Sequence, residues 1–164
     1  MIVWQDMVNG GRYMAPFMTW LPALFPKLKI RMSDHLHSLL GRKNVHGREE
    51  FERECLETIE ALSPFPCIST WVLFNEGWGQ FHTKKLTNSV MSLDPTRLID
   101  SASGWFDRGT GDFKSEHNYF EKLTVIPDKR AFVISEYGGY ACQIKNHVST
   151  HSVYGYKIYP NAEL

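Results

Sequence analysis

The sequence predicts an α/β fold in which parallel strands alternate with helices. Two runs of β-forming residues, at 68–74 and 131–134, are apolar on both faces, as buried parallel strands are. A helical pattern at 47–62 precedes the first run, and a second at 82–93 follows it. Strands that alternate with helices indicate βαβ units and a parallel sheet.

Local signals along the chain predict the remaining elements. Residues 2–7 predict a short strand, and residues 12–46 predict a packed, irregular connection with a short helix at 33–40. A strand is expected at 98–101 and a brief one near 116–120, and the pattern after Gly139 assigns no element there. Because the first strand starts almost at residue 1, we expect the chain to begin inside a domain.

Composition restricts the functional class. A chain of 164 residues allows one domain. Its 18 basic and 18 acidic residues give a net charge of zero, which argues against a nucleic-acid partner. No apolar stretch reaches the roughly 18 residues that a membrane span needs. Three scattered cysteines predict neither a disulfide framework nor a zinc site, and they suit a reducing compartment, so we expect a cytoplasmic protein.

A glutamate follows each of the two buried strands. Asn75-Glu76 comes after the first strand and Glu136 ends the second, each just before glycines. Ligands of parallel α/β proteins bind at the carboxyl ends of the strands. Two glutamates facing one crevice there provide an acid/base and a nucleophile for the cleavage of an acetal. The alternative is that each is a solvated rim residue with an ordinary salt-bridge partner.

Several segments together resemble the catalytic domain of glycoside hydrolase family 2. In chain order they are VWQDM, WVLFNEGWGQ, DPTRLIDSASGW, the pair His117-x-Tyr119, and ISEYGG. The family includes β-galactosidases, β-glucuronidases and β-mannosidases, and its catalytic domain is a TIM barrel. The resemblance implies that residues 1–164 form a partial (β/α)8 barrel, roughly strands 3 to 7, truncated at both ends, because a whole barrel takes about 250 residues. Further barrel strands and β-sandwich domains would then belong to the parent chain, which is compatible with an oligomer.

The resemblance also implies a role for each matching residue. Glu76 would be the general acid/base and Glu136 the nucleophile of a retaining enzyme that hydrolyses the O-glycosidic bonds of β-glycosides, β-galactosides among them. Asn75 would hydrogen-bond the sugar 2-hydroxyl, and Tyr119 would orient Glu136. Further residues are candidates for the substrate-binding shell: Asp6, Trp78, Trp105 and His117. The mechanism requires no cofactor, although the resemblance allows magnesium or sodium near the site.

Alternatives stay open for the aromatic and imidazole side chains. Trp78, Trp105 and Tyr137 predict either a platform for a sugar face or simple core packing. His117 lines the sugar site or is a hydrogen-bonded core histidine.

The pair His35-x-His37 has metal-ligating side chains but no third ligand nearby in the sequence, which favours a surface helix over a metal site.

The competing function for the chain is a non-catalytic carbohydrate-binding or structural fragment of such a barrel. An esterase is disfavoured because no G-x-S-x-G motif occurs.

Overall fold

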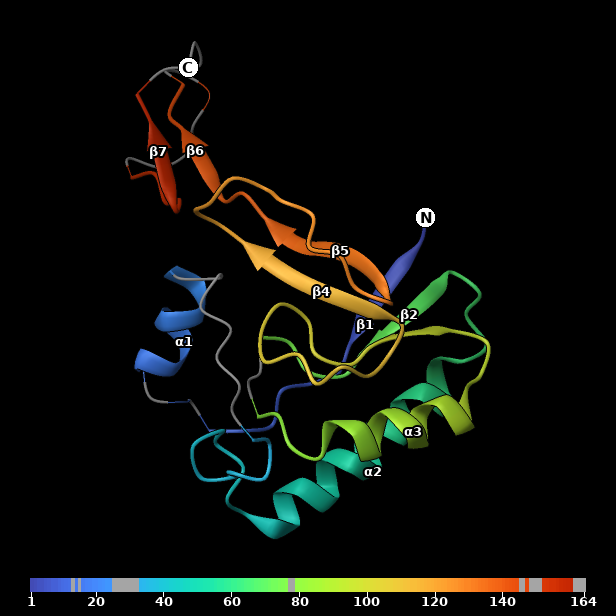
Figure 1. Cartoon of the computed structure of the whole chain (residues 1–164). Helices are drawn as coiled ribbons and strands as arrows, with labels where there is room; N and C mark the ends of the chain where they lie inside the picture. Colours follow the sequence, from blue (N-terminus) through green and yellow to red (C-terminus); the bar gives the residue numbers. More distant parts are fainter. Residues whose placement is uncertain are drawn as a thin grey trace.

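The computed structural model describes residues 1–12, 14, 16–24, 33–76, 79–144, 147 and 152–160. Within these residues the chain is a mixed α/β structure with parallel strands and three helices (Figure 1). The elements in chain order are β1 (Val3–Asp6), α1 (Pro16–Leu24), α2 (Val45–Leu62), β2 (Ile68–Val72), α3 (Thr83–Leu93), β3 (Leu98–Asp100), β4 (Phe113–Asn118), β5 (Ala131–Tyr137), β6 (Tyr140–Cys142) and β7 (Lys157–Tyr159). The predicted α/β class with parallel strands is confirmed.

Strands β1, β2 and β3 form a parallel sheet in that order. Helix α2 precedes β2 and helix α3 precedes β3, which gives the helical crossovers that neighbouring parallel strands require. The two helices contact each other and lie along the same side of the sheet (Figure 1).

The main hydrophobic core lies between this sheet and helices α2 and α3. Helix α2 contributes Phe51, Cys55 and Ile59, which share one face because they are spaced by four residues. The side chain of Asn44 caps the helix by accepting a hydrogen bond from the Gly47 amide at 3.3 Å. That cap explains why α2 begins before residue 47, where the sequence predicted its start.

Strands β4 and β5 form a second parallel pair, and β6 and β7 form a third. The segment before β4 is tied to β3 at Ile99. The Ile99 amide donates to Asp112 Oδ2 at 2.8 Å, and the Ile99 carbonyl accepts from the Asp112 amide at 2.9 Å. The strands of the described residues therefore form three small parallel sheets and not one continuous barrel sheet.

The structure differs from the sequence-based expectations at five places. Residues 33–40 form successive turns, not a helix. Residues 16–24 were expected to belong to an irregular connection and instead form α1, which begins at Pro16, because proline is favoured at the first helical position. The segment after Gly139 contains β6 and β7. Strand β5 is only half-buried over 132–134 because it pairs with β4 alone among the described strands. The strand expected near 116–120 lies earlier, at β4.

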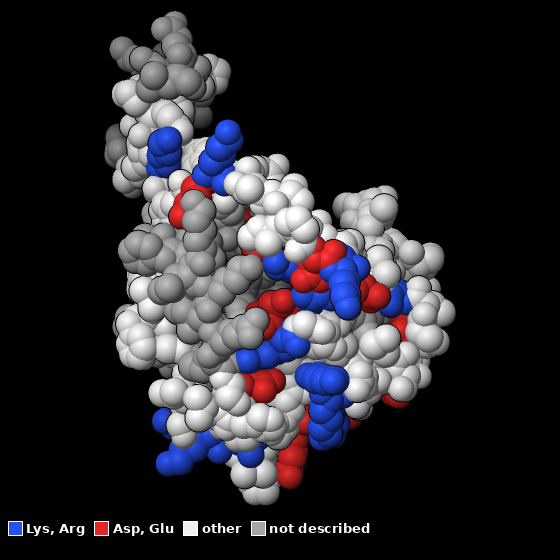
Figure 2. Space-filling model, viewed as in Figure 1, with Lys and Arg blue, Asp and Glu red and all other residues white. Residues whose placement is uncertain are grey.

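Charged side chains of both signs lie interspersed on the face seen in Figure 2. Close pairs include Lys85 with Glu52 at 3.0 Å and Arg130 with Asp107 at 2.7 Å. Such mixing is expected of a chain with equal numbers of acidic and basic residues. Among the helices of the described residues, none has both the length and the apolar character to cross a membrane.

Candidate active site

The segment that follows β2 carries Glu76 in a fixed, strained conformation. The Glu76 amide donates to the Ser103 carbonyl at 2.8 Å, and the Ser103 amide donates to the Phe74 carbonyl at 2.8 Å. Asn75 and Ser103 form a parallel bridge, so the segment runs beside the extension of β3. Glu76 itself has φ of 51°, a left-handed conformation that costs a non-glycine residue about 1–3 kcal/mol. Strain of this kind is retained where the surrounding structure fixes a functional side chain.

The second glutamate is placed by the β4–β5 pair. Glu136 lies opposite His117 in the register of these strands, next to an irregularity between Glu116 and His117. Tyr119 follows immediately after the end of β4. One strand pair therefore directs Glu136, His117 and Tyr119 to the same end of the sheet, where the segment after β2 also arrives.

The two glutamates meet at the Tyr119 hydroxyl. That hydroxyl lies 2.9 Å from Glu76 Oε1 and 2.6 Å from Glu136 Oε2. His117 bridges the same pair: its Nδ1 lies 3.2 Å from Glu76 Oε1, and its Nε2 lies 3.6 Å from Glu136 Oε1. Carboxylate oxygens of Glu76 and Glu136 lie within 4.8 Å of one another. The two carboxylates, 60 residues apart in the sequence, thus form one cluster.

Burial differs across the cluster. The His117 side chain is fully buried, the Glu76 side chain is 21% exposed, and the Glu136 side chain is 45% exposed. Burial of the Tyr119 phenol, with its hydrogen bond to Glu136 and the nearby charge of Glu76, raises the Tyr119 pKa, so the phenol stays protonated. The cluster is thus buried at His117 and open to solvent at Glu136.

A chain of serine hydroxyl groups contacts the His117 ring. Its Nε2 lies 3.1 Å from Ser103 Oγ, and Ser103 Oγ lies 3.0 Å from Ser135 Oγ. Ser135 Oγ in turn lies 2.6 Å from Ser115 Oγ. Sequence reasoning missed these serines. The available signal was a small polar residue near the end of three separate strands, which resembles ordinary strand-end composition.

Gly104 allows the His117 ring to approach the backbone. Gly104 has φ of +83°, and a Cβ atom built there would collide with the imidazole. Trp105 next to it is buried in a second hydrophobic cluster with Tyr119, and its ring contacts that of His117 at 6.4 Å between centroids. Trp105 thus packs behind the imidazole.

Two aspartates lie close to the cluster. Partial desolvation raises the pKa of Asp6, at the end of β1, and the charge of Glu136 adds to the shift while His117 opposes it. Asp100, the last residue of β3, is 1% exposed, and burial raises its pKa to about 6. Asp6 lies close enough to Glu136 and His117 for their charges to affect its pKa, and its place in a substrate-binding shell stays a prediction. The buried Asp100 was not anticipated.

Of the three aromatic residues predicted to stack on a sugar, the described residues include only Trp105 and Tyr137. Trp78 lies outside the described residues. Tyr137, directly after Glu136, is 67% exposed.

A metal ion would find Glu76, His117 and Glu136 as donors, but both ring nitrogens of His117 already contact neighbouring side chains. Magnesium prefers oxygen ligands throughout, so this cluster suits proton transfer better than magnesium binding.

No protein-family model matches the chain, and a search of curated proteins finds no match.

Proposed function

We propose that this chain carries the catalytic centre of a retaining β-glycosidase of the glycoside hydrolase family 2 type. The observation behind the proposal is the meeting of Glu76 and Glu136, whose carboxylate oxygens lie within 4.8 Å of one another around the Tyr119 hydroxyl. Carboxyl groups stand about 5–5.5 Å apart in retaining glycosidases and about 6.5–9.5 Å apart in inverting ones. The short separation favours retention, because it leaves little room for a water molecule between the second carboxylate and the sugar.

In the proposed reaction, Glu76 protonates the glycosidic oxygen while Glu136 attacks the anomeric carbon. The bond to the leaving alcohol breaks as an ester bond to Glu136 forms. Glu76, now a carboxylate, then takes a proton from water, and the hydroxide formed displaces Glu136 and releases the sugar with its original configuration. Tyr119 orients Glu136 throughout, and the buried His117 fixes both carboxylates from behind.

The strand arrangement supports a barrel as the setting of this site. Neighbouring strands β1, β2 and β3 follow sequence order and run parallel, as do β4 and β5. TIM barrels arrange consecutive strands in this way and place their active sites at the carboxyl ends. Glu76 lies just beyond the end of β2, and Glu136 lies near the end of β5. We therefore propose that these strands are consecutive members of a (β/α)8 barrel.

Hydrolysis of aryl β-glycosides tests the proposal directly. The wild-type chain should cleave at least one of a β-galactoside, a β-glucuronide and a β-mannoside, which also identifies the sugar. Glu76→Gln and Glu136→Gln should each lower kcat at least about 100-fold, the lower range for loss of a catalytic acid or base. Glu57→Gln, on the exposed face of α2, is the matched control and should retain activity. A folded wild-type chain without hydrolysis would favour the non-catalytic carbohydrate-binding fragment.

Azide distinguishes the two glutamates by stereochemistry. With Glu136→Ala, azide can enter from the side that the missing carboxylate leaves open, which gives an α-glycosyl azide from a β-glycoside. With Glu76→Ala, azide attacks the glycosyl-enzyme and gives the β-glycosyl azide. The reverse pattern would exchange the two roles, and products of one configuration from both variants would contradict a covalent intermediate on Glu136.

A further inference from the structure

Three histidines from two separate segments converge on one surface spot away from the glutamates. His35 and His37 belong to the turns at 33–40, and His82 precedes the first residue of α3. One ring nitrogen from each histidine lies within 4.8 Å of the other two. His37 Nε2 and His82 Nε2 are 3.2 Å apart. The sequence offered only the pair His35-x-His37; the missing third imidazole comes from 45 residues further along the chain.

We propose that His35, His37 and His82 bind a divalent transition-metal ion, with zinc as the best fit. Tetrahedral zinc holds imidazole nitrogens at about 2.0–2.1 Å, which places two ligand nitrogens about 3.4 Å apart. His37 and His82 already have this spacing. His35 is exposed, so a rotation of its side chain brings the third nitrogen into place. Three nitrogen ligands leave a fourth position for water or an anion.

The backbone fixes these positions independently of the imidazoles. The Thr83 amide donates to Asp34 Oδ2 at 2.8 Å, which joins the turn to the start of α3. The Arg42 amide donates to the His37 carbonyl at 2.6 Å. His82 has φ of 41°, a left-handed conformation that directs its side chain away from the helix axis and toward the turn. A ligand set that is already positioned loses little conformational entropy when the ion binds.

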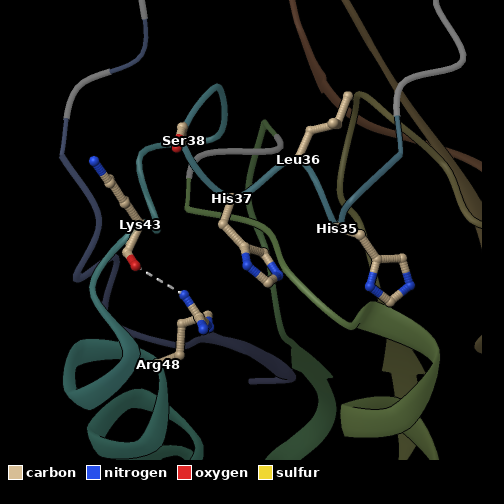
Figure 3. Close-up of a pocket in the computed structure, with 6 residues that line it drawn as sticks. All are labelled: His35, Leu36, His37, Ser38, Lys43 and Arg48. Atoms are coloured by element: carbon tan, nitrogen blue, oxygen red, sulfur yellow. Dashed lines mark hydrogen bonds between the residues drawn. The ribbon is translucent and has the colours of Figure 1, made fainter.

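The alternating direction of side chains in the turn also favours a shared ligand. Figure 3 shows the rings of His35 and His37 on one side of the backbone, with Leu36 and Ser38 directed to the other. Among the described residues, the contact between His37 and His82 is the sole hydrogen bond made by these three rings. A hydrogen bond between two histidines needs only His37 and His82. It therefore does not explain why His35 also lies close to them.

The surroundings indicate the character of the fourth ligand. A surface pocket of about 310 Å³ beside the histidines is also lined by Lys43 and Arg48. The Arg48 guanidinium is turned to backbone carbonyls, at 2.6 Å from Arg42 O and 3.2 Å from Lys43 O (Figure 3). The guanidinium is therefore held beside the pocket by the backbone, and the open position of the metal is left to water or an anion.

Zinc titration of the whole, tag-free chain tests the site. A chromogenic chelator competing for zinc should report one equivalent bound by the wild type, and cobalt should give the intense visible absorption of a tetrahedral complex. His82→Asn removes a ligand, and asparagine tolerates the left-handed backbone there. We expect it to weaken binding at least about 100-fold, since even the loss of an outer hydrogen-bond partner costs about 10–100-fold. His46→Asn, an exposed histidine of α2, is the control and should bind as the wild type does.

Other outcomes overturn the proposal. They are the absence of stoichiometric binding, wild-type affinity in His82→Asn, or loss of binding in His117→Asn alone, which would assign the ion to the glutamate cluster. If circular dichroism shows that His82→Asn is unfolded, His35→Ala replaces it, because His35 is exposed and its removal leaves the core unchanged. Wild-type affinity in His35→Ala would then exclude the three-histidine site.

Discussion

Replacing Asp100 by asparagine should stabilise the protein at neutral pH and change little in acid. Asp100 is 1% exposed, and among the described residues neither of its carboxylate oxygens accepts a hydrogen bond of full geometry, although the hydroxyls of Ser103 and Ser115 lie near them. Burial therefore raises its pKa from 3.8 to about 6, even though the hydroxyls of Ser115 and Ser103 and the charge of His117 act in the opposite direction. Above that pKa the folded protein must keep a charged carboxylate away from water.

The pKa shift gives the expected magnitude. The folded state binds this proton more tightly than the unfolded chain does, so the free energy of unfolding falls as pH rises from about 4 to about 6 and stays lower above. A shift of about 2 units corresponds to about 3 kcal/mol. Asparagine keeps the shape without the charge. Asp100→Asn should therefore gain up to about 3 kcal/mol at pH 7.5 and less than about 1 kcal/mol at pH 4.

Urea denaturation at pH 4 and pH 7.5 measures both values. The exposed Glu57→Gln is the control, and its effect should not depend on pH in this way. The reasoning is refuted if the Asp100→Asn difference is the same at both pH values, or if the variant is less stable than the wild type at pH 7.5. Either result would mean that the carboxylate is solvated or hydrogen-bonded in the folded protein.

Three further predictions concern single side chains. Gly104→Ala and Gly109→Ala both place a methyl group at positive φ, but only the first collides with His117, so it should lower Tm further; equal losses would contradict the packing argument. Against the effect of burial, hydrogen bonds from neighbouring hydroxyl, indole and guanidinium groups lower the pKa of Asp94 to about 2. Asp94→Ala should therefore lose about 1–3 kcal/mol in denaturation at pH 7, with the deficit shrinking as pH falls from about 4 toward 2; a constant deficit would argue against this network. Tyr119→Phe should lower kcat for an aryl β-glycoside about 100-fold with little change in KM, and an unchanged kcat would remove the phenol from the mechanism.

Hydrophobic pattern predicted the parts of the site that end buried strands. The apolar run before Glu76 predicted a strand covered on both faces, and β2 is mostly buried. The run before Glu136 predicted the same, but β5 is only half-buried. Two such carboxylates must lie at the same edge if their strands are parallel, and the structure brings them together. The apolar pattern predicted the existence of both strands because it is local, whereas the burial of β5 depends on which strands pair with it.

The supporting residues could not be predicted because they act through tertiary contacts. Ser103 lies in the segment after β3 and Ser135 lies in β5, and only the folded chain places their hydroxyls 3.0 Å apart. His82 gave no signal either, since it lies just before the first residue of α3 and contacts a turn far back in the chain. The expected helix at 33–40 also misled, because in a helix His35 and His37 would lie on different faces.

The Tyr119 hydroxyl lies between the two carboxylates, and this position restricts where their protons can lie. A phenol has one hydrogen, so it can donate to Glu136 or to Glu76 but not to both at the same moment. Both short contacts become hydrogen bonds only when one glutamate is protonated and donates back to the phenol oxygen. When the two glutamates share a single proton, both contacts with the phenol are hydrogen bonds. When neither glutamate is protonated, one of the two contacts has no hydrogen. Exchanging the roles of the two carboxyls requires the proton of one glutamate to pass to the phenol oxygen while the phenol proton passes to the other glutamate, with no movement of any heavier atom.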